Sequence, residues 1–89
     1  MLERHLTVAN RLGLHARATA KLVQLLSGFR CNATLAAKGR EVNAKSIMGV
    51  MLLAAGQGTT VTVRTDGADE AAAMDAVADL FERRFDEEG

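Results

Sequence analysis

Apolar residues repeat with two different periods along this chain, and the period changes at glycines and polar turns. In the first segment Leu2, Leu6 and Val8 alternate with polar residues, which is typical of a strand with one buried face. From Ala16 the spacing lengthens to three and four residues, which predicts a helix over 16–27. Because both periods occur within one short sequence, the chain is restricted to folds that mix strands and helices.

Strand-like alternation returns twice further along the chain. Residues 31–37 alternate, Lys38 and Gly39 supply a turn, and 40–43 can return as a short partner strand, so a hairpin is predicted. Residues 59–65 alternate again and predict a fourth strand.

Three helices are predicted, and their ends carry recognisable signals. We expect the first helix to stop at Gly28 in a left-handed conformation. The apolar run 47–53 predicts a short helix with Ser46 as its N-cap. In the last helix two acidic side chains in the first turn and two basic ones at the end complement the helix dipole: Asp69, Glu70, Arg83 and Arg84.

The predicted order is strand-helix-strand-strand-helix-strand-helix, which is an α+β arrangement. Each long helix has one apolar stripe and each strand one apolar face, so helices on one face of a largely antiparallel four-stranded sheet bury every stripe at once. The opposite face is left to polar side chains, and His5 is expected there in solvent. With 89 residues and 9.5 kDa, a single domain over 1–89 is predicted.

Composition excludes several classes of function. Eleven basic and eleven acidic residues give a formal charge of +0, and the chain has no Trp and no Tyr, which disfavours a nucleic-acid binder. No segment approaches the roughly 20 apolar residues of a membrane span, so no membrane association is expected. Cys31, the single cysteine, cannot form an internal disulfide and is expected as a buried thiol, which favours a reducing cytoplasm.

The segment Gly13-Leu14-His15-Ala16-Arg17 joins the first strand to the first helix and carries the strongest chemical signal. A helix N-terminus presents unpaired N–H groups and the positive end of the dipole, and Arg17 adds a guanidinium within one turn. An anion held there would touch His15, whose imidazole, when neutral, can attack phosphorus. The alternative is a histidine that merely caps the helix or lies solvated.

Two motifs together decide between these interpretations. Gly-Leu-His-Ala-Arg at 13–17 and Asn-Ala-Lys-Ser-Ile-Met-Gly-Val-Met at 43–51 resemble those of HPr, the phosphocarrier family of the bacterial phosphoenolpyruvate-dependent phosphotransferase system. The resemblance implies an open-faced β-sandwich with strand order 1-4-2-3 and three helices. It also implies that His15 takes a phosphoryl group on Nδ1 from enzyme I and passes it to enzyme IIA proteins, and that Arg17 stabilises the phosphate.

The resemblance implies a stoichiometric carrier rather than a true catalyst, with no cofactor and no metal, acting as a monomer. Two departures from the family pattern are present. Ala18 stands where family members commonly have proline, and alanine is also tolerated in a first helical turn. The acidic tail 85–89 is longer than in many members and is expected to fray. Whether the carrier serves sugar uptake or nitrogen regulation stays open.

Ser46 has two interpretations. As an N-cap hydroxyl it contributes about 1 kcal/mol to stability, which is sufficient reason for its presence. The resemblance implies that it is also a regulatory site, phosphorylated by an HPr kinase/phosphorylase, and such a phosphate would place negative charge beside the surface that partners approach.

The short helix is also expected to leave an apolar patch in solvent. Ile47, Val50 and Leu53 can face the sheet, but so short a helix cannot bury the remaining large side chains as well. Flexible methionines suit a surface that docks several partners. Because the family contacts its partners through this helix and the first one, the expected partner-binding residues are Ala16, Ala20, Ile47, Met48, Met51 and Leu52.

Two other functions compete with a phosphoryl carrier. A regulatory binding module would keep the docking patch and Ser46 but leave His15 idle. A small RNA-binding domain is disfavoured by the neutral charge and the scarcity of aromatic residues. His5, His15 and Cys31 do not compose a metal site.

Overall fold

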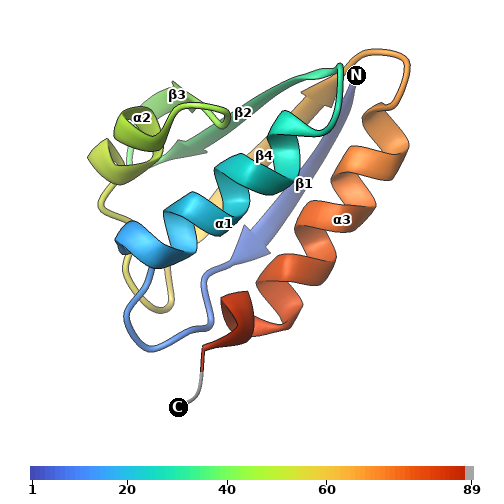
Figure 1. Ribbon diagram of the computed structural model, residues 1–89. Helices are drawn as coiled ribbons and strands as arrows, with labels where there is room; N and C mark the ends of the chain where they lie inside the picture. The colour runs from blue at the N-terminus through green and yellow to red at the C-terminus, as the bar shows by residue number, and fades with distance from the viewer. Residues whose placement is uncertain (88–89) are drawn as a thin grey trace.

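The computed structural model describes residues 1–87 and contains a four-stranded sheet with three α-helices lying across one of its faces (Figure 1). The predicted order of strands and helices is confirmed, and most boundaries lie within one residue of the prediction. The elements are β1 (Leu2–Thr7), α1 (Ala16–Ser27), β2 (Asn32–Ala37), β3 (Arg40–Asn43), α2 (Ile47–Leu52), β4 (Thr60–Asp66), α3 (Glu70–Glu82) and the 3-10 turn η1 (Arg84–Asp86).

The strands are ordered β1-β4-β2-β3 and every neighbouring pair is antiparallel, as the family resemblance implied. β4 pairs with β1 at His5 and Thr62 and with β2 at Val63 and Leu35. The last strand of the sequence is therefore inserted between the first two, and β1 and β3 form the edges.

The core lies between the sheet and the helices. Leu22 and Leu26 of α1, Val63 of β4 and Val77 of α3 have 0% of their surface exposed, as the predicted stripes require. Burial of such a side chain stabilises the fold by about 1.5–3 kcal/mol. The polar face of the sheet carries His5, which is exposed and whose Nδ1 lies 3.1 Å from the Thr62 hydroxyl.

Two sequence-based expectations about the first strand and helix are wrong in detail. Leu2 is 38% exposed and Leu6 is half-buried, and of the three predicted inward residues only Val8, just after β1, is fully buried. The cause is that β1 is an edge strand, with a neighbouring strand on one side. Gly28 is right-handed, with φ −79° and ψ −6°. Its N–H donates to the Leu25 carbonyl, a 3-10-type bond that closes α1 without a left-handed residue.

Asp69 does not serve in the first turn of α3 as predicted; it is the N-cap residue, and its side chain makes no capping bond. Its carboxylate instead accepts N–H bonds from Arg30 at 2.7 Å and Cys31 at 2.9 Å. These bonds hold the pKa of Asp69 below its ordinary value of 3.8. Asp69 therefore connects the α1–β2 loop to the start of α3, and Glu70 is the one acidic residue in the first turn of α3.

The tail does not fray at residues 85–87, which corrects the prediction for that part; 88–89 lie outside the described residues. Phe85 is 3% exposed and packs on Phe81, with 4.9 Å between the ring centroids. The Lys21 ammonium of α1 donates to the Phe85 carbonyl at 3.0 Å and to Asp86 Oδ2 at 3.2 Å. We call residues 84–87 the C-terminal turn.

Candidate functional site

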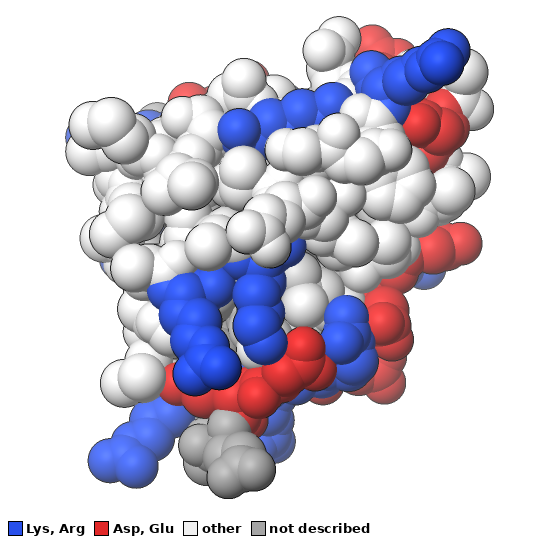
Figure 2. All heavy atoms as spheres, viewed as in Figure 1, with Lys and Arg blue, Asp and Glu red and all other residues white. Residues whose placement is uncertain are grey.

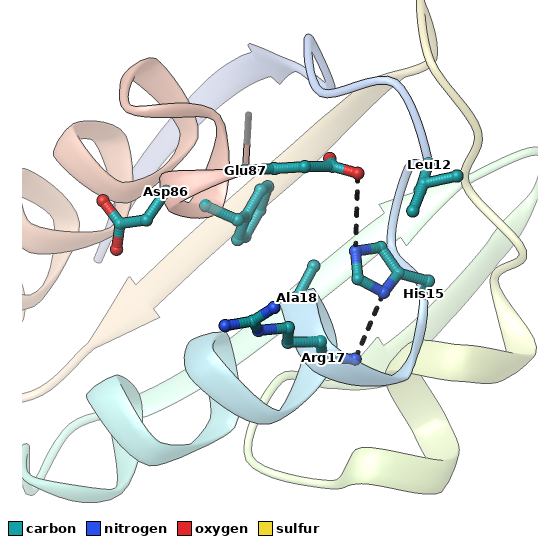
Figure 3. A pocket seen from close by; sticks show the side chains of 7 residues that line it. Leu12, His15, Arg17, Ala18, Asp86 and Glu87 are labelled. Carbon is teal, nitrogen blue, oxygen red and sulfur yellow. Dashed lines mark hydrogen bonds and ion pairs between the residues drawn. The ribbon is translucent and has the colours of Figure 1, made fainter. Parts of the chain in front are cut away.

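His15 is the N-cap residue of α1, with an extended backbone at φ −76° and ψ 178°. The predicted position at the helix entrance is therefore confirmed. Its Nδ1 accepts the backbone N–H of Arg17 at 3.3 Å (Figure 3). The ring thus caps the first turn and lies beside the positive end of the helix dipole.

The loop before His15 is held from both sides. The buried Asn10 amide donates to the Gly13 carbonyl at 2.7 Å, and the Leu14 N–H donates to the Ala55 carbonyl at 2.9 Å. Gly13 has φ 67°, and a Cβ there would lie 2.6 Å from the Ala55 oxygen. The close approach of these two loops therefore requires glycine and fixes the backbone from which His15 projects.

The two ring nitrogens of His15 have different surroundings. Because Nδ1 accepts a hydrogen bond, the neutral ring carries its proton on Nε2. Nε2 points to the Glu87 carboxylate, with 3.9 Å between Nε2 and Oε1. Nδ1 is thus the nitrogen that carries an electron pair rather than a proton, and that pair is directed toward the helix N-terminus, where it accepts the Arg17 N–H.

His15 and Arg17 lie on one pocket of about 430 Å³. Arg17 is exposed and makes no ion pair within residues 1–87, so its guanidinium remains available to an anion. In Figure 3 the imidazole rises from the α1 entrance toward Glu87, and the Arg17 side chain extends from the same entrance toward the side of the pocket where Asp86 lies. The remaining lining residues are Leu12, Ala18, Phe85, Asp86 and Glu87.

The sequence did not indicate that the C-terminal turn would take part in the site. The His15 side chain is 29% exposed, because Glu87 covers Nε2. One signal was available: Phe85 is the single aromatic residue in an otherwise acidic tail, and a large apolar side chain there favours anchoring.

The predicted apolar patch is present on α2. Met48 is 77%, Leu52 62% and Met51 44% exposed. Ile47 was expected to be able to face the sheet, but it is 47% exposed and belongs to the patch. Of the six helical residues, Val50 alone is buried. Leu12, at 64% exposure, is a large exposed side chain beside the pocket that the sequence did not single out.

The first helix contributes less to this surface. Ala16 is exposed and Ala20 is half-buried. In Figure 2 the face over α1 and α2 is largely uncharged, and basic and acidic side chains gather along its rim near the C-terminal end of the described chain. The face over α1 and α2 is therefore an apolar surface bordered by charge.

Ser46 is the N-cap of α2, as predicted, and its hydroxyl accepts the Gly49 N–H at 3.1 Å. Ser46 is half-buried, one residue from the patch. Cys31 is buried, as predicted, and burial, followed by Asp69, raises the pKa of its thiol. No helix within residues 1–87 has the length and apolar character needed to cross a bilayer.

Comparison with known proteins agrees with this geometry. Residues 2–83 match the family described as the PTS HPr component phosphorylation site. The phosphocarrier protein HPr of Xylella fastidiosa strain Temecula1 is 69% identical over 88 residues, which cover 99% of each chain.

Solved structures give the same relationship. HPr-C-His from Thermoanaerobacter tengcongensis covers 100% of both chains with a TM-score of 0.96 at 42% identity. A structure described as an HPr dimer from the same organism has a TM-score of 0.79 at 41% identity and covers 98% of this chain and 100% of that chain.

Proposed function

The chain belongs to the HPr family, the phosphocarriers of the phosphotransferase system, and from that premise we propose that His15 accepts a phosphoryl group from enzyme I and passes it to enzyme IIA proteins. The observation that carries this proposal is the hydrogen bond from the Arg17 N–H to Nδ1 at 3.3 Å. This bond supports Nδ1 as the nitrogen that carries the electron pair, and it directs that pair toward a helix N-terminus.

Electrostatics favour a phosphoryl group at this position. A group bonded to Nδ1 would carry its negative oxygens beside the first N–H groups of α1, where the helix dipole stabilises an anion by about 0.3–1 kcal/mol. Arg17 would pair with the same oxygens as a charge-assisted donor. Both side chains already line one pocket. Nδ1 must release the Arg17 N–H before it bonds to phosphorus, and that N–H is then available to a phosphoryl oxygen.

Membership of the HPr family supports a role for the protein as a carrier that is loaded and unloaded by its partners. Donor and acceptor proteins each provide their own catalytic groups and must reach the same nitrogen in turn. The exposed side chains of α2 support docking beside the pocket: Ile47, Met48, Met51 and Leu52. Ala16 and Ala20 would extend that surface onto α1.

Ser46 gives this carrier a second site of modification. A phosphate added there by an HPr kinase/phosphorylase would sit at the edge of the α2 patch and oppose docking by adding charge to an apolar surface. The half-buried hydroxyl accepts the Gly49 N–H, so the first turn of α2 would have to adjust for the kinase to reach it. Cytoplasmic location and a monomeric state remain predictions.

The test is phosphoryl transfer in solution. Incubation with enzyme I, Mg²⁺ and phosphoenolpyruvate is expected to give one acid-labile phosphohistidine signal by phosphorus NMR. His15→Ala removes it, and His5→Ala, which changes the other histidine, keeps it. Undiminished labelling of His15→Ala would refute the proposal, and partner binding without any labelling would favour the regulatory binding module instead.

A further inference from the structure

The C-terminal turn brings a carboxylate to the nitrogen of His15 that the phosphoryl group does not use. Glu87 Oε1 lies 3.9 Å from Nε2. This distance is too long for a hydrogen bond but short enough for an electrostatic attraction between the carboxylate and the Nε2 proton. The Glu87 side chain is only 14% exposed, and its Oε2 is buried without a hydrogen-bond partner within residues 1–87. A desolvated charge of this kind acts strongly on its neighbour.

The conformation that places Glu87 is an unusual one. Arg84, Phe85 and Asp86 are three consecutive left-handed residues, with φ of 55°, 55° and 59°. Each costs about 1–2 kcal/mol relative to the right-handed form. Such a turn persists only where other contacts hold it, so tertiary contacts rather than local backbone preference determine its conformation.

Those contacts are present on both sides of the turn. The Phe85 ring is buried against Phe81, and Lys21 binds both the Phe85 carbonyl and Asp86. Asp86 also pairs with Arg83 at 3.0 Å. In Figure 3 the Asp86 carboxylate lies on the far side of the turn from the imidazole, so Glu87 is the acidic side chain that faces His15.

We propose that Glu87 is a positioning residue for His15, an inference that rests on the proposed function. The Nδ1 electron pair forms a bond to phosphorus while the bond from phosphorus to the donor's leaving atom breaks and its electron pair stays with the donor. Nε2 keeps its proton, so the ring becomes positively charged. The Glu87 carboxylate compensates this charge from the opposite nitrogen, as a buried carboxylate does for a catalytic imidazole.

The same contact acts on the second transfer. While Nε2 stays protonated, the ring is a good leaving group, and the bond between Nδ1 and phosphorus breaks with its electron pair returning to Nδ1. The charge on the ring is partial in each transition state and complete in the phosphorylated carrier, where the bond between Nδ1 and phosphorus is fully formed. Glu87 therefore accelerates acceptance and shifts the equilibrium between donor and carrier toward the phosphorylated carrier, while it holds the Nε2 proton that makes the ring a good leaving group.

The first test reads the ring in the full, unphosphorylated chain, by nitrogen-15 NMR of His15. The wild-type protein is expected to carry the proton of its neutral ring on Nε2, and Glu87→Gln is expected to shift the Nε2 resonance. The matched control is Glu82→Gln, the same isosteric change at the exposed end of α3. A proton on Nδ1, or superimposable spectra of wild type and Glu87→Gln, would overturn the inference.

The second test measures rates. Glu87→Gln is expected to slow phosphorylation of His15 by phospho-enzyme I by about tenfold and to shift the transfer equilibrium back toward phospho-enzyme I, while Glu82→Gln changes neither. Unchanged rates for Glu87→Gln would contradict the inference. If the wild-type chain takes up no phosphoryl group, the proposed function fails, and the NMR spectra still decide the role of Glu87.

A double-mutant cycle tests the part played by the turn. Phe85→Ala removes the anchor and is expected to reproduce the slow transfer of Glu87→Gln, with circular dichroism confirming that the chain is folded. Adding Glu87→Gln to Phe85→Ala is then expected to slow transfer no further. Fully additive effects would show that Phe85 does not act through Glu87.

Discussion

The Lys21 ammonium lies 3.2 Å from Asp86 Oδ2 and joins the first helix to the last turn of the described chain. The same ammonium donates to the Phe85 carbonyl at 3.0 Å, so one side chain holds two successive residues of the C-terminal turn. Since Lys21 is on α1, a little over one turn beyond Arg17, the position of the C-terminal turn is tied to the helix that carries the site.

Acid is expected to release the C-terminal turn. The Lys21 hydrogen bond, with the charge of Arg83, holds the pKa of Asp86 below its ordinary value of 3.8. A lowered pKa contributes stability above the ordinary value, and that stability is lost as the pH falls through the lowered one. Unfolding measured against pH is expected to show a wild-type advantage over Lys21→Met at neutral pH that shrinks under strong acid to the part contributed by the bond from Lys21 to the Phe85 carbonyl. An advantage independent of pH would contradict this.

Gly13→Ala is expected to disturb the site through the backbone. Both the positive φ of 67° and the 2.6 Å approach of a Cβ to the Ala55 oxygen oppose the substitution. We expect a loss of about 2–3 kcal/mol in the free energy of unfolding and slower phosphorylation of His15. Gly39→Ala is the control, because Gly39 has φ 76° with nothing within 4 Å. Equal losses in the two variants would show that the close approach has no effect.

Ser46→Ala is expected to lower the free energy of unfolding by about 1 kcal/mol, because the Gly49 N–H loses its acceptor. Ser46→Asp keeps an acceptor at the N-cap and is expected to restore most of that stability while weakening binding to enzyme I. Urea unfolding and a binding titration separate the two effects. The control is Ser27→Ala, an exposed serine at the end of α1, for which a change within about 0.5 kcal/mol is expected.

Met48→Glu tests the docking patch. Because Met48 is 77% exposed, we expect stability to change by less than about 0.5 kcal/mol. Binding to enzyme I, measured by calorimetry, is expected to weaken at least about tenfold, since a charge would enter an apolar contact. Ala71→Glu adds the same charge on the exposed surface of α3 and is expected to leave binding unchanged. Equal affinities for the two variants would place the docking surface elsewhere.

The sequence alone determined the features that depend on near neighbours. The spacing of Leu22 and Leu26 predicted a buried stripe, and the alternation around Val63 predicted an inward strand face, because helix and strand geometry convert sequence period directly into direction. The position of His15 at the helix entrance followed in the same way, since one short loop separates β1 from α1. The order of the strands came from resemblance to a family rather than from any local pattern.

Tertiary structure decided what faces His15. Glu87 and His15 lie near opposite ends of the chain, and no periodicity relates them. Their contact depends on burial of Phe85, on Lys21 reaching across from α1 and on three left-handed residues that local preferences disfavour. The same holds for Ile47, for which the local pattern allowed either the sheet or the docking patch and packing left the side chain in solvent. Each outcome depends on which side chains, distant in sequence, fill the limited buried volume of the fold. Local sequence patterns do not determine which side chains those are.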